Sequence, residues 1–287
     1  MEKAFIEKNW PLTRVKVGEA LGENNNLGII ESAEGKYVYK IARDWKTHEA
    51  VERDLSVFDF LNSIGFPHIS RYLKTISGKG VVVVGNDLIY LIEYIEGTHP
   101  KASPETYAEL GRITGLLHGI KDFPFETDFD ADVIIEDLKE TSKQFEFGKE
   151  YLKVVESLPS FHDLPKSLIH GDISPLNTIK KADETFILLD WDEAGIGTRI
   201  LDIGHPLINQ FISEDLEFFE DNARAFYKAY LKEQELSDEE MNRVFDSGMF
   251  WACMYIIYGD TAKRWKRIQW AIENKSVLEK LIRSCSS

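Results

Sequence analysis

The chain has 287 residues, enough for one large domain or two lobes, and 43% of them are hydrophobic, so a core can form without disulfides or a structural metal. Only two cysteines occur, Cys253 and Cys285, and no segment has the roughly 20 apolar residues of a membrane span, so we expect a soluble cytoplasmic protein with no membrane partner. The net charge of −15 argues against nucleic acid as a partner, and it either favours a cationic substrate or serves solubility alone.

Strand patterns dominate the first hundred residues, where alternating or β-branched apolar runs lie between turn signals. One helix is expected among them, because residues 47–62 place apolar side chains at helical spacing after Thr47 as the N-cap. The predicted strands are 13–21, 27–32 and 36–42, followed by a hairpin over 80–97. We therefore predict a small antiparallel β-rich lobe at residues 1–97.

Helical patterns dominate after Ser103, which is expected to cap a helix that has Pro104 at its first position. The further predicted helices cover 132–157, 214–233, 237–258 and 261–282. The segment 213–221, where the second of these four begins, is strongly acidic. A short hairpin between 168 and 195 is the one clear strand segment of this region. The predicted fold class is α+β, with residues 98–287 forming a larger, mainly helical lobe and with ligands bound in a cleft between the lobes.

The segment "HGDISPLN" followed by "FILLDWDEAG" carries the chemistry. Asp172 and Asn177 flank a Pro-containing turn, and Asp190 ends an apolar strand. Carboxylate and amide oxygens are ligands suited to Mg²⁺, which also binds substrate phosphates. A further carboxylate can orient or deprotonate a hydroxyl. These are the requirements of phosphoryl transfer.

The pattern H-G-D-x-x-x-x-N, followed by "LLDWDEAG" and "ILDIG", resembles the aminoglycoside phosphotransferase and choline kinase superfamily, whose fold is protein-kinase-like. The resemblance covers roughly residues 15–205. It implies that Asp172 is the catalytic base, that Asn177 and Asp190 bind Mg²⁺, and that Asp202 is a structural acid supporting the catalytic loop. It also implies phosphotransfer from ATP or GTP to a hydroxyl of a small molecule.

The same resemblance assigns a nucleotide site to the small lobe. Lys40, in "YVYKIA", corresponds to the strand lysine that pairs with the nucleotide phosphates. Its helix partner is expected to be Asp54, because apolar residues follow it at +3, +4 and +7, with Glu52 as the alternative. Asn26 lies in the turn 21–28, which is expected to lie over the phosphates.

The segment "YLIEYIEG" corresponds to the hinge, where adenine would bond the carbonyl of Glu93 and the amide of Ile95. Two histidines, His118 and His170, are expected to be packed and structural. Asp192 and Glu193 could supplement the metal site or face solvent.

The acceptor is expected to bind within residues 206–282. Trp251, Tyr255 and Tyr258, spaced i, i+4 and i+7, are either core residues or the wall of a pocket for an amine, through cation–π contact. Choline-type alcohols, ethanolamine, aminoglycosides, homoserine and sugars all stay open as acceptors. A kinase-like module that binds nucleotide without turnover is the alternative function, but the full Lys/Asp/Asn/Asp set favours catalysis.

Overall fold

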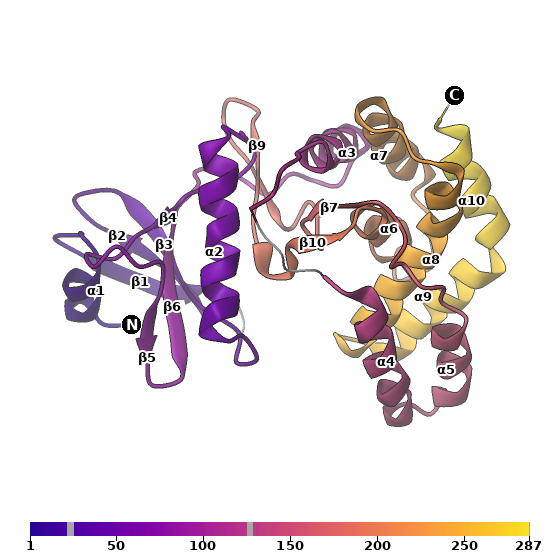
Figure 1. Cartoon of the computed structure of the whole chain (residues 1–287), viewed down its shortest axis with the longest axis horizontal. Helices are drawn as coiled ribbons and strands as arrows, with labels where there is room; N and C mark the ends of the chain where they lie inside the picture. Colours follow the sequence, from indigo (N-terminus) through magenta and orange to yellow (C-terminus); the bar gives the residue numbers. More distant parts are fainter. Residues whose placement is uncertain (22–25, 125–128, 287) are drawn as a thin grey trace. The chain divides into compact units, whose positions relative to one another are not determined.

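The computed structural model describes residues 1–21, 26–124 and 129–286 (Figure 1). The chain divides into two compact units. The first unit comprises Met1–Thr98 and Ile179–Leu189, and the second comprises His99–Thr178 and Asp190–Ser287. Among the described residues, no helix has both the length and the apolar character needed to cross a membrane.

The first unit is built on a six-stranded sheet in which β1-β2-β3-β6-β4 lie in that order and β5 also pairs with β6, every pair being antiparallel. The strands are β1 (Lys16–Leu21), β2 (Leu27–Glu31), β3 (Lys36–Ile41), β4 (Tyr72–Leu73), β5 (Val82–Val84) and β6 (Asp87–Glu93). Two helices belong to this unit, α1 (Lys3–Asn9) and α2 (His48–Ser63). The predicted meander and helix are therefore present, whereas α1 and β4 were not predicted.

Each face of the sheet is covered by one helix, which follows from the period of two along β6. Ile89 and Leu91 pack in a cluster with the apolar side chains of α1, whereas Leu88 and Tyr90 pack in a second cluster with those of α2. Lys40 of β3 is paired in register with Tyr90, and directly paired residues of neighbouring strands lie on the same face. Lys40 therefore lies on the face that α2 covers.

The second unit is mainly helical. Its helices are α3 (Pro104–His118), α4 (Ala131–Thr141), α5 (Gly148–Glu156), α6 (Ile200–Asn209), α7 (Glu220–Glu233), α8 (Asp238–Met254), α9 (Thr261–Glu273) and α10 (Lys275–Ser284). Strands β7 (Lys166–Ile169) and β10 (Gly195–Thr198) pair with each other. The hairpin of β8 (Thr178–Lys180) and β9 (Phe186–Leu188) lies between them in sequence, and its residues from Ile179 on belong to the first unit.

Three predicted helices differ from the observed ones. Residues 132–157 form two helices, α4 and α5, and 261–282 form α9 and α10, which are separated by Asn274. The segment before Glu220 is not helical, because Leu216 has a left-handed φ of 66° and the Ser213 hydroxyl accepts hydrogen bonds from the backbone of Asp215 and Glu217. Such side-chain bonds compete with helix formation at this position.

Helices α6 and α8 pack backbone against backbone at Gly204. A Cβ atom at Gly204 would lie 1.9 Å from the Ser247 hydroxyl oxygen and 2.7 Å from the Val244 carbonyl oxygen. The Ser247 hydroxyl donates to the carbonyl of Ile200, so it is also fixed from the other side. The close contact of the two helices therefore requires glycine at position 204.

We expect Gly204→Ala to lower the free energy of unfolding by about 2 kcal/mol, because overpacking outweighs the gain in helix propensity. The measurement is urea unfolding followed by circular dichroism. Gly18→Ala is the control, since a Cβ there would meet its nearest atom at 3.4 Å. A Gly204→Ala variant as stable as the wild type would contradict the packing described.

Candidate active site

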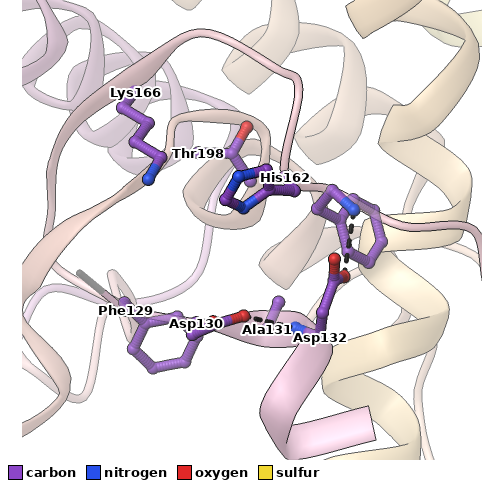
Figure 2. A pocket seen from close by; sticks show the side chains of 8 residues that line it. Phe129, Asp130, Ala131, Asp132, His162, Lys166 and Thr198 are labelled. Atoms are coloured by element: carbon purple, nitrogen blue, oxygen red, sulfur yellow. Dashed lines mark hydrogen bonds between the residues drawn. The ribbon is translucent and has the colours of Figure 1, made fainter.

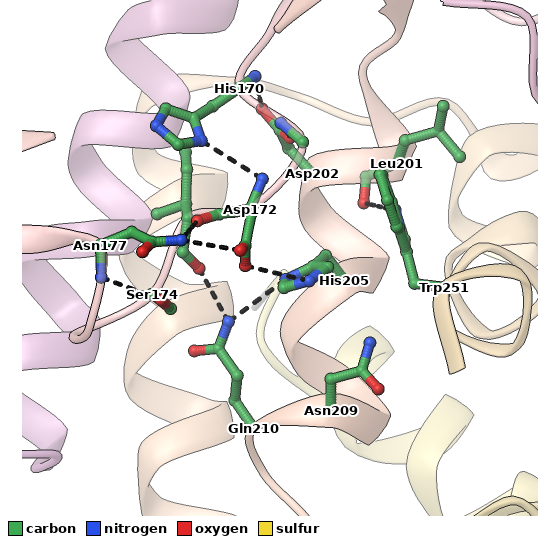
Figure 3. Close-up of polar contacts among 12 residues, drawn as sticks. His170, Asp172, Ser174, Asn177, Leu201, Asp202, His205, Asn209, Gln210 and Trp251 are labelled. Atoms are coloured by element: carbon green, nitrogen blue, oxygen red, sulfur yellow. Dashed lines mark hydrogen bonds and ion pairs between the residues drawn. The ribbon is translucent and has the colours of Figure 1, made fainter. Parts of the chain in front are cut away.

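The loop that carries Asp172 is anchored by a buried carboxylate. Asp202 of α6 accepts the backbone amide of His170 at 2.8 Å and that of Gly171 at 2.7 Å (Figure 3). His118 of α3 lies with its Nε2 3.2 Å from the same carboxylate, and both side chains are buried. The structural role predicted for Asp202 is therefore confirmed, as are the packed positions of His118 and His170.

Gly171 is the second fixed point of the loop. Its φ is +85°, a left-handed conformation that residues other than glycine rarely adopt. A Cβ atom there would also lie 2.6 Å from the Cβ and 2.9 Å from the carbonyl oxygen of Glu193. The glycine of "HGD" is thus explained by both backbone conformation and space.

Both oxygens of the Asp172 carboxylate have a polar neighbour. The Asn177 amide nitrogen donates to one Asp172 carboxylate oxygen at 2.7 Å and to the Asp172 carbonyl at 3.0 Å. Nε2 of His205 lies 3.3 Å from the other carboxylate oxygen (Figure 3). The Asp172 side chain is nevertheless 33% exposed, so its orientation is fixed while it stays accessible to a substrate.

His205 was missed by the sequence analysis. It is buried on α6, one turn after Asp202, and its Nδ1 lies 3.2 Å from the Gln210 amide nitrogen, which donates to the carbonyl of Ile173 at 2.8 Å. Burial lowers the pKa of His205, an effect larger than the opposing influence of the Asp172 and Asp202 carboxylates. The imidazole is therefore neutral near pH 7. Only the spacing of Asp202 and His205 on one helix face could have indicated it.

The two predicted metal ligands lie at the same end of the β8–β9 hairpin. Asn177 immediately precedes β8 and Asp190 follows β9 by two positions, and an antiparallel hairpin brings these two ends together. Asp190 has φ 56° and ψ 66°, a conformation that is uncommon outside glycine and recurs at functional sites. Because the Asn177 nitrogen is used by Asp172, its amide oxygen is the atom left for a cation.

The donor set suits Mg²⁺ held mainly by a nucleotide. Among the described residues, no group of three or more His, Cys, Asp or Glu side chains is arranged to hold a metal ion. One carboxylate and one amide oxygen fit an ion that keeps phosphate and water ligands. Of the two acids that follow Asp190, Asp192 and Glu193, Asp192 is buried and does not face solvent.

The residues predicted for the nucleotide lie in the first unit. Lys40 is half-buried on β3, and the carbonyl of Asn26 accepts the amide of Ile41 at 2.8 Å, while residues 22–25 of the predicted phosphate turn lie outside the described residues. Asp54 is buried with the expected apolar neighbours, and the structure gives it an ion pair with Lys46, which the sequence analysis did not single out. Lys46 lies in the short segment between β3 and α2, eight residues before Asp54. The predicted pairing of Lys40 with Asp54 stays a prediction.

The predicted hinge follows β6. Glu93 is its last residue, with an exposed side chain and a backbone amide that donates to the Arg71 carbonyl at 2.8 Å. In the part of the chain that the structure describes, no hydrogen bond is found for the amide of Ile95. The geometry is compatible with a hinge that uses backbone groups.

A small cavity elsewhere in the second unit has no part in this chemistry (Figure 2). It holds about 30 Å³ and is lined by residues around Asp130, His162, Lys166 and Thr198, none of which was predicted to act. The buried Thr198 hydroxyl has no hydrogen-bond partner among the described residues. A single ordered water fits such a volume.

The aromatic residues Trp251, Tyr255 and Tyr258 differ in how far they are buried. Trp251 is fully buried on α8 and donates from its indole nitrogen to the Leu201 carbonyl at 2.9 Å, so it is a core residue. Tyr258 lies beyond the end of α8 and is 50% exposed. Although α8 ends at Met254, the three rings contact one another in series, with ring centroids 5.5 Å apart for Trp251 and Tyr255 and 5.8 Å apart for Tyr255 and Tyr258.

The Asp202 carboxylate should also set the acid stability of the protein. Burial acts to raise its pKa, but hydrogen bonding and charge interaction with His118 and the hydrogen bond from the His170 backbone outweigh burial, so the pKa lies below its usual value. A carboxyl whose pKa is lowered on folding stabilises the protein above its unfolded pKa of about 3.9, and the stabilisation is lost as the pH falls through the folded value.

We expect Asp202→Asn to lower the free energy of unfolding by roughly 3 kcal/mol at pH 7, because it breaks a buried charge network. The difference from the wild type should stay constant between pH 7 and pH 5 and shrink below about pH 4. Urea unfolding of both proteins across this pH range is the measurement. A difference that already narrows between pH 7 and pH 5 is the outcome that opposes this assignment.

Comparison with known proteins gives the chain its family. The model of the family described as "Phosphotransferase enzyme family" matches residues 20–240. A homoserine kinase from Zymomonas mobilis subsp. mobilis is 24% identical over 233 residues, which cover 76% of this chain and 71% of that protein.

Solved structures show the same fold. Choline kinase LicA from Streptococcus pneumoniae superposes with a TM-score of 0.67 at 16% identity, covering 96% of this chain and 97% of that one. Amicoumacin kinase hAmiN, solved with AMP-PNP and Ca²⁺, superposes with a TM-score of 0.66 at 17% identity, covering 92% and 91%. These likenesses confirm the predicted two-lobed, protein-kinase-like α+β fold. Because the family model matches well over half of the chain, this protein belongs to the phosphotransferase enzyme family and is a phosphotransferase.

Proposed function

We propose that the protein transfers the γ-phosphoryl group of ATP or GTP to a hydroxyl of a small molecule, with Mg²⁺ bound to the nucleotide. The observation that carries this proposal is the Asp172 carboxylate, which accepts a hydrogen bond from Asn177, lies 3.3 Å from His205 and is still one-third exposed. A general base must be both oriented and accessible to the proton it takes. The relatives named as kinases of homoserine and choline support a small-molecule acceptor.

In the proposed reaction the acceptor hydroxyl hydrogen-bonds to Asp172. The hydroxyl oxygen forms a bond to the γ-phosphorus while the bond from that phosphorus to the β,γ-bridging oxygen breaks, and the hydroxyl proton passes to the Asp172 carboxylate. The products are the phosphorylated acceptor and the nucleoside diphosphate. Bound Mg²⁺ supplies charge neutralisation at the phosphate oxygens.

The remaining predicted residues complete this proposal. Asn177 and Asp190 would hold the metal, and Lys40 would contact the nucleotide phosphates. Asp54, Asn26, Glu93 and Ile95 would shape the nucleotide site of the first unit, where Lys46 is the lysine observed against Asp54. The likeness to a kinase structure solved with AMP-PNP supports the use of a nucleotide.

We also propose that the protein acts in the cytoplasm. Both cysteines are free and buried, as expected for a protein that folds in a reducing compartment. The nucleotide donor is available there.

We expect Asp172→Ala to lower kcat by a factor of about 10³, because the proton acceptor and its orientation are both removed. Nucleotide binding should be retained, so a nucleotide at 100 times its Kd should still add about 2.7 kcal/mol of stability. Nucleotide consumption and thermal-shift titration are the two measurements. Asp183→Ala is the control, because Asp183 is an exposed acid in the β8–β9 turn. Wild-type turnover by Asp172→Ala would falsify the assignment of the base.

Asp190→Ala should raise the Mg²⁺ concentration needed for half-maximal rate by a factor of at least roughly 10–100, the range seen when residues that only support metal ligands are changed. The measurement is a Mg²⁺ titration of the initial rate at saturating nucleotide. The expected change is in metal dependence and not in the KM of the acceptor. An unaltered Mg²⁺ titration would remove Asp190 from the metal site.

A further inference from the structure

The imidazole ring of His205 is enclosed by other side chains. Only 3% of the side chain is exposed. The rings of Trp251 and Tyr255 pack against it edge to face, with centroids 5.2 and 5.6 Å away and interplanar angles of 85° and 89°. A polar atom buried in this way is costly unless it has a hydrogen-bond partner. Each ring nitrogen of His205 must therefore be satisfied where the packing holds it.

Gln210 determines which nitrogen of His205 carries the proton. Its amide nitrogen lies 2.8 Å from the Ile173 carbonyl and 3.2 Å from Nδ1 of His205 (Figure 3). A carbonyl can only accept, so the nitrogen of Gln210 and not its oxygen faces Ile173. The same nitrogen can only donate, so Nδ1 of His205 accepts and has no proton. A neutral imidazole carries one proton, which then lies on Nε2.

The protonated nitrogen faces the catalytic base. Nε2 of His205 lies 3.3 Å from Oδ1 of Asp172, and it is a buried atom that makes no hydrogen bond of good geometry with any described residue. The other carboxylate oxygen of Asp172 already accepts from Asn177 at 2.7 Å. Hydrogen bonds to a catalytic group are often long before the substrate binds and tighten in the complex. The N–H group of His205 is thus a fixed donor directed at Oδ1.

The same arrangement excludes His205 as a proton relay. To take a proton from Asp172 it would need a bare Nε2, whereas the proton lies there and Nδ1 is engaged by Gln210. Burial lowers the pKa of His205, and His170 acts in the same direction, against the carboxylates of Asp172 and Asp202. The ring therefore stays neutral and acts only as a donor.

We propose that His205 and Gln210 are positioning residues of the phosphotransfer. Gln210 fixes the tautomer of His205, and the Nε2–H group of His205 orients the Asp172 carboxylate toward the acceptor hydroxyl. Gln210 also binds the carbonyl of Ile173, the residue after Asp172, so one side chain holds both the donor and the loop that carries the base. This inference rests on the base assigned to Asp172 above and adds the residues that orient it.

Nitrogen NMR of the full-length protein tests the tautomer without any acceptor. Protonated and bare ring nitrogens of a neutral imidazole have well-separated ¹⁵N shifts, and the His205 signals are those that His205→Phe lacks. We expect a proton on Nε2 and none on Nδ1 at pH 7. In Gln210→Glu a carboxylate faces Nδ1, so Nδ1 should become protonated. A wild-type proton on Nδ1, or a bare Nδ1 in Gln210→Glu, overturns the inference.

Kinetics separate orientation from packing, using whichever of choline, L-homoserine and kanamycin the wild type phosphorylates fastest with ATP and Mg²⁺. His205→Phe keeps the aromatic packing but has no donor, and it should lower kcat by a factor of roughly 10–100, since a misplaced catalytic group can cost about that much. The KM values of nucleotide and acceptor should change by less than about threefold. His205→Gln restores an N–H group near the position of Nε2, so its kcat should stay within about fivefold of the wild type.

Ser247→Ala is the control for stability alone. It removes a buried hydrogen bond from α8 to the Ile200 carbonyl of α6, so it should lower the Tm and leave kcat unchanged. A His205→Phe variant with the kcat of the wild type overturns the inference, and so does a His205→Gln variant as slow as His205→Phe. If none of the three acceptors is phosphorylated and ATP does not raise the Tm, the proposed phosphotransfer fails, and the NMR result still decides the role of Gln210 at His205.

Discussion

The geometry of the active site depends on one buried carboxylate, that of Asp202. Burying an anion is costly unless donors surround it, and Asp202 receives the amides of His170 and Gly171 together with the imidazole of His118. Two of these donors are backbone groups of the catalytic loop, so the interactions that stabilise the charge also fix the path of the chain into Asp172. The left-handed conformation of Gly171 is part of the same arrangement. A neutral side chain at position 202 could not bind both amides as strongly.

Departures from ordinary backbone geometry occur at Asp190, beside this loop, and also elsewhere in the chain, at Arg14, Asp122, Glu184 and Leu216. Asp190 has a left-handed backbone, and Asn209, Gln210 and Arg267 each leave a buried polar atom unpaired. Away from the site the helices follow the usual rules, as in the capping box of Ser237 and Glu240 at the start of α8. Local rules are generally broken where function requires it, and the remainder of the fold provides the compensating stability.

Sequence patterns predicted the features that depend on residues near one another in the chain, such as strand alternation and helix caps. The alternation in β3 and β6, the Thr47 cap of α2 and the Ser103 cap of α3 are all present as predicted. The pairing of β7 with β10 was not predicted, because its partners are more than twenty residues apart and neither strand has a strong pattern. Helix breaks such as the one at Asn274 were also missed, since the apolar spacing continues across them. The motif indicated Asp172, Asn177 and Asp190, but His205 reaches the Asp172 carboxylate only because α6 packs beside the loop, and no motif marks it.

The net charge of the whole chain is a poor guide to the acceptor, because a bound acceptor contacts only a few side chains. The overall charge of −15 suggests attraction of a cation, yet α9 contains four basic residues and one acidic residue, and Arg267 is among the basic ones. Fields from exposed charges are screened beyond about 8 Å in physiological salt, whereas a partly buried guanidinium acts on a ligand at contact distance. The choice of acceptor then rests on the polar atoms at contact distance from the hydroxyl that reacts, and not on the field of the whole chain.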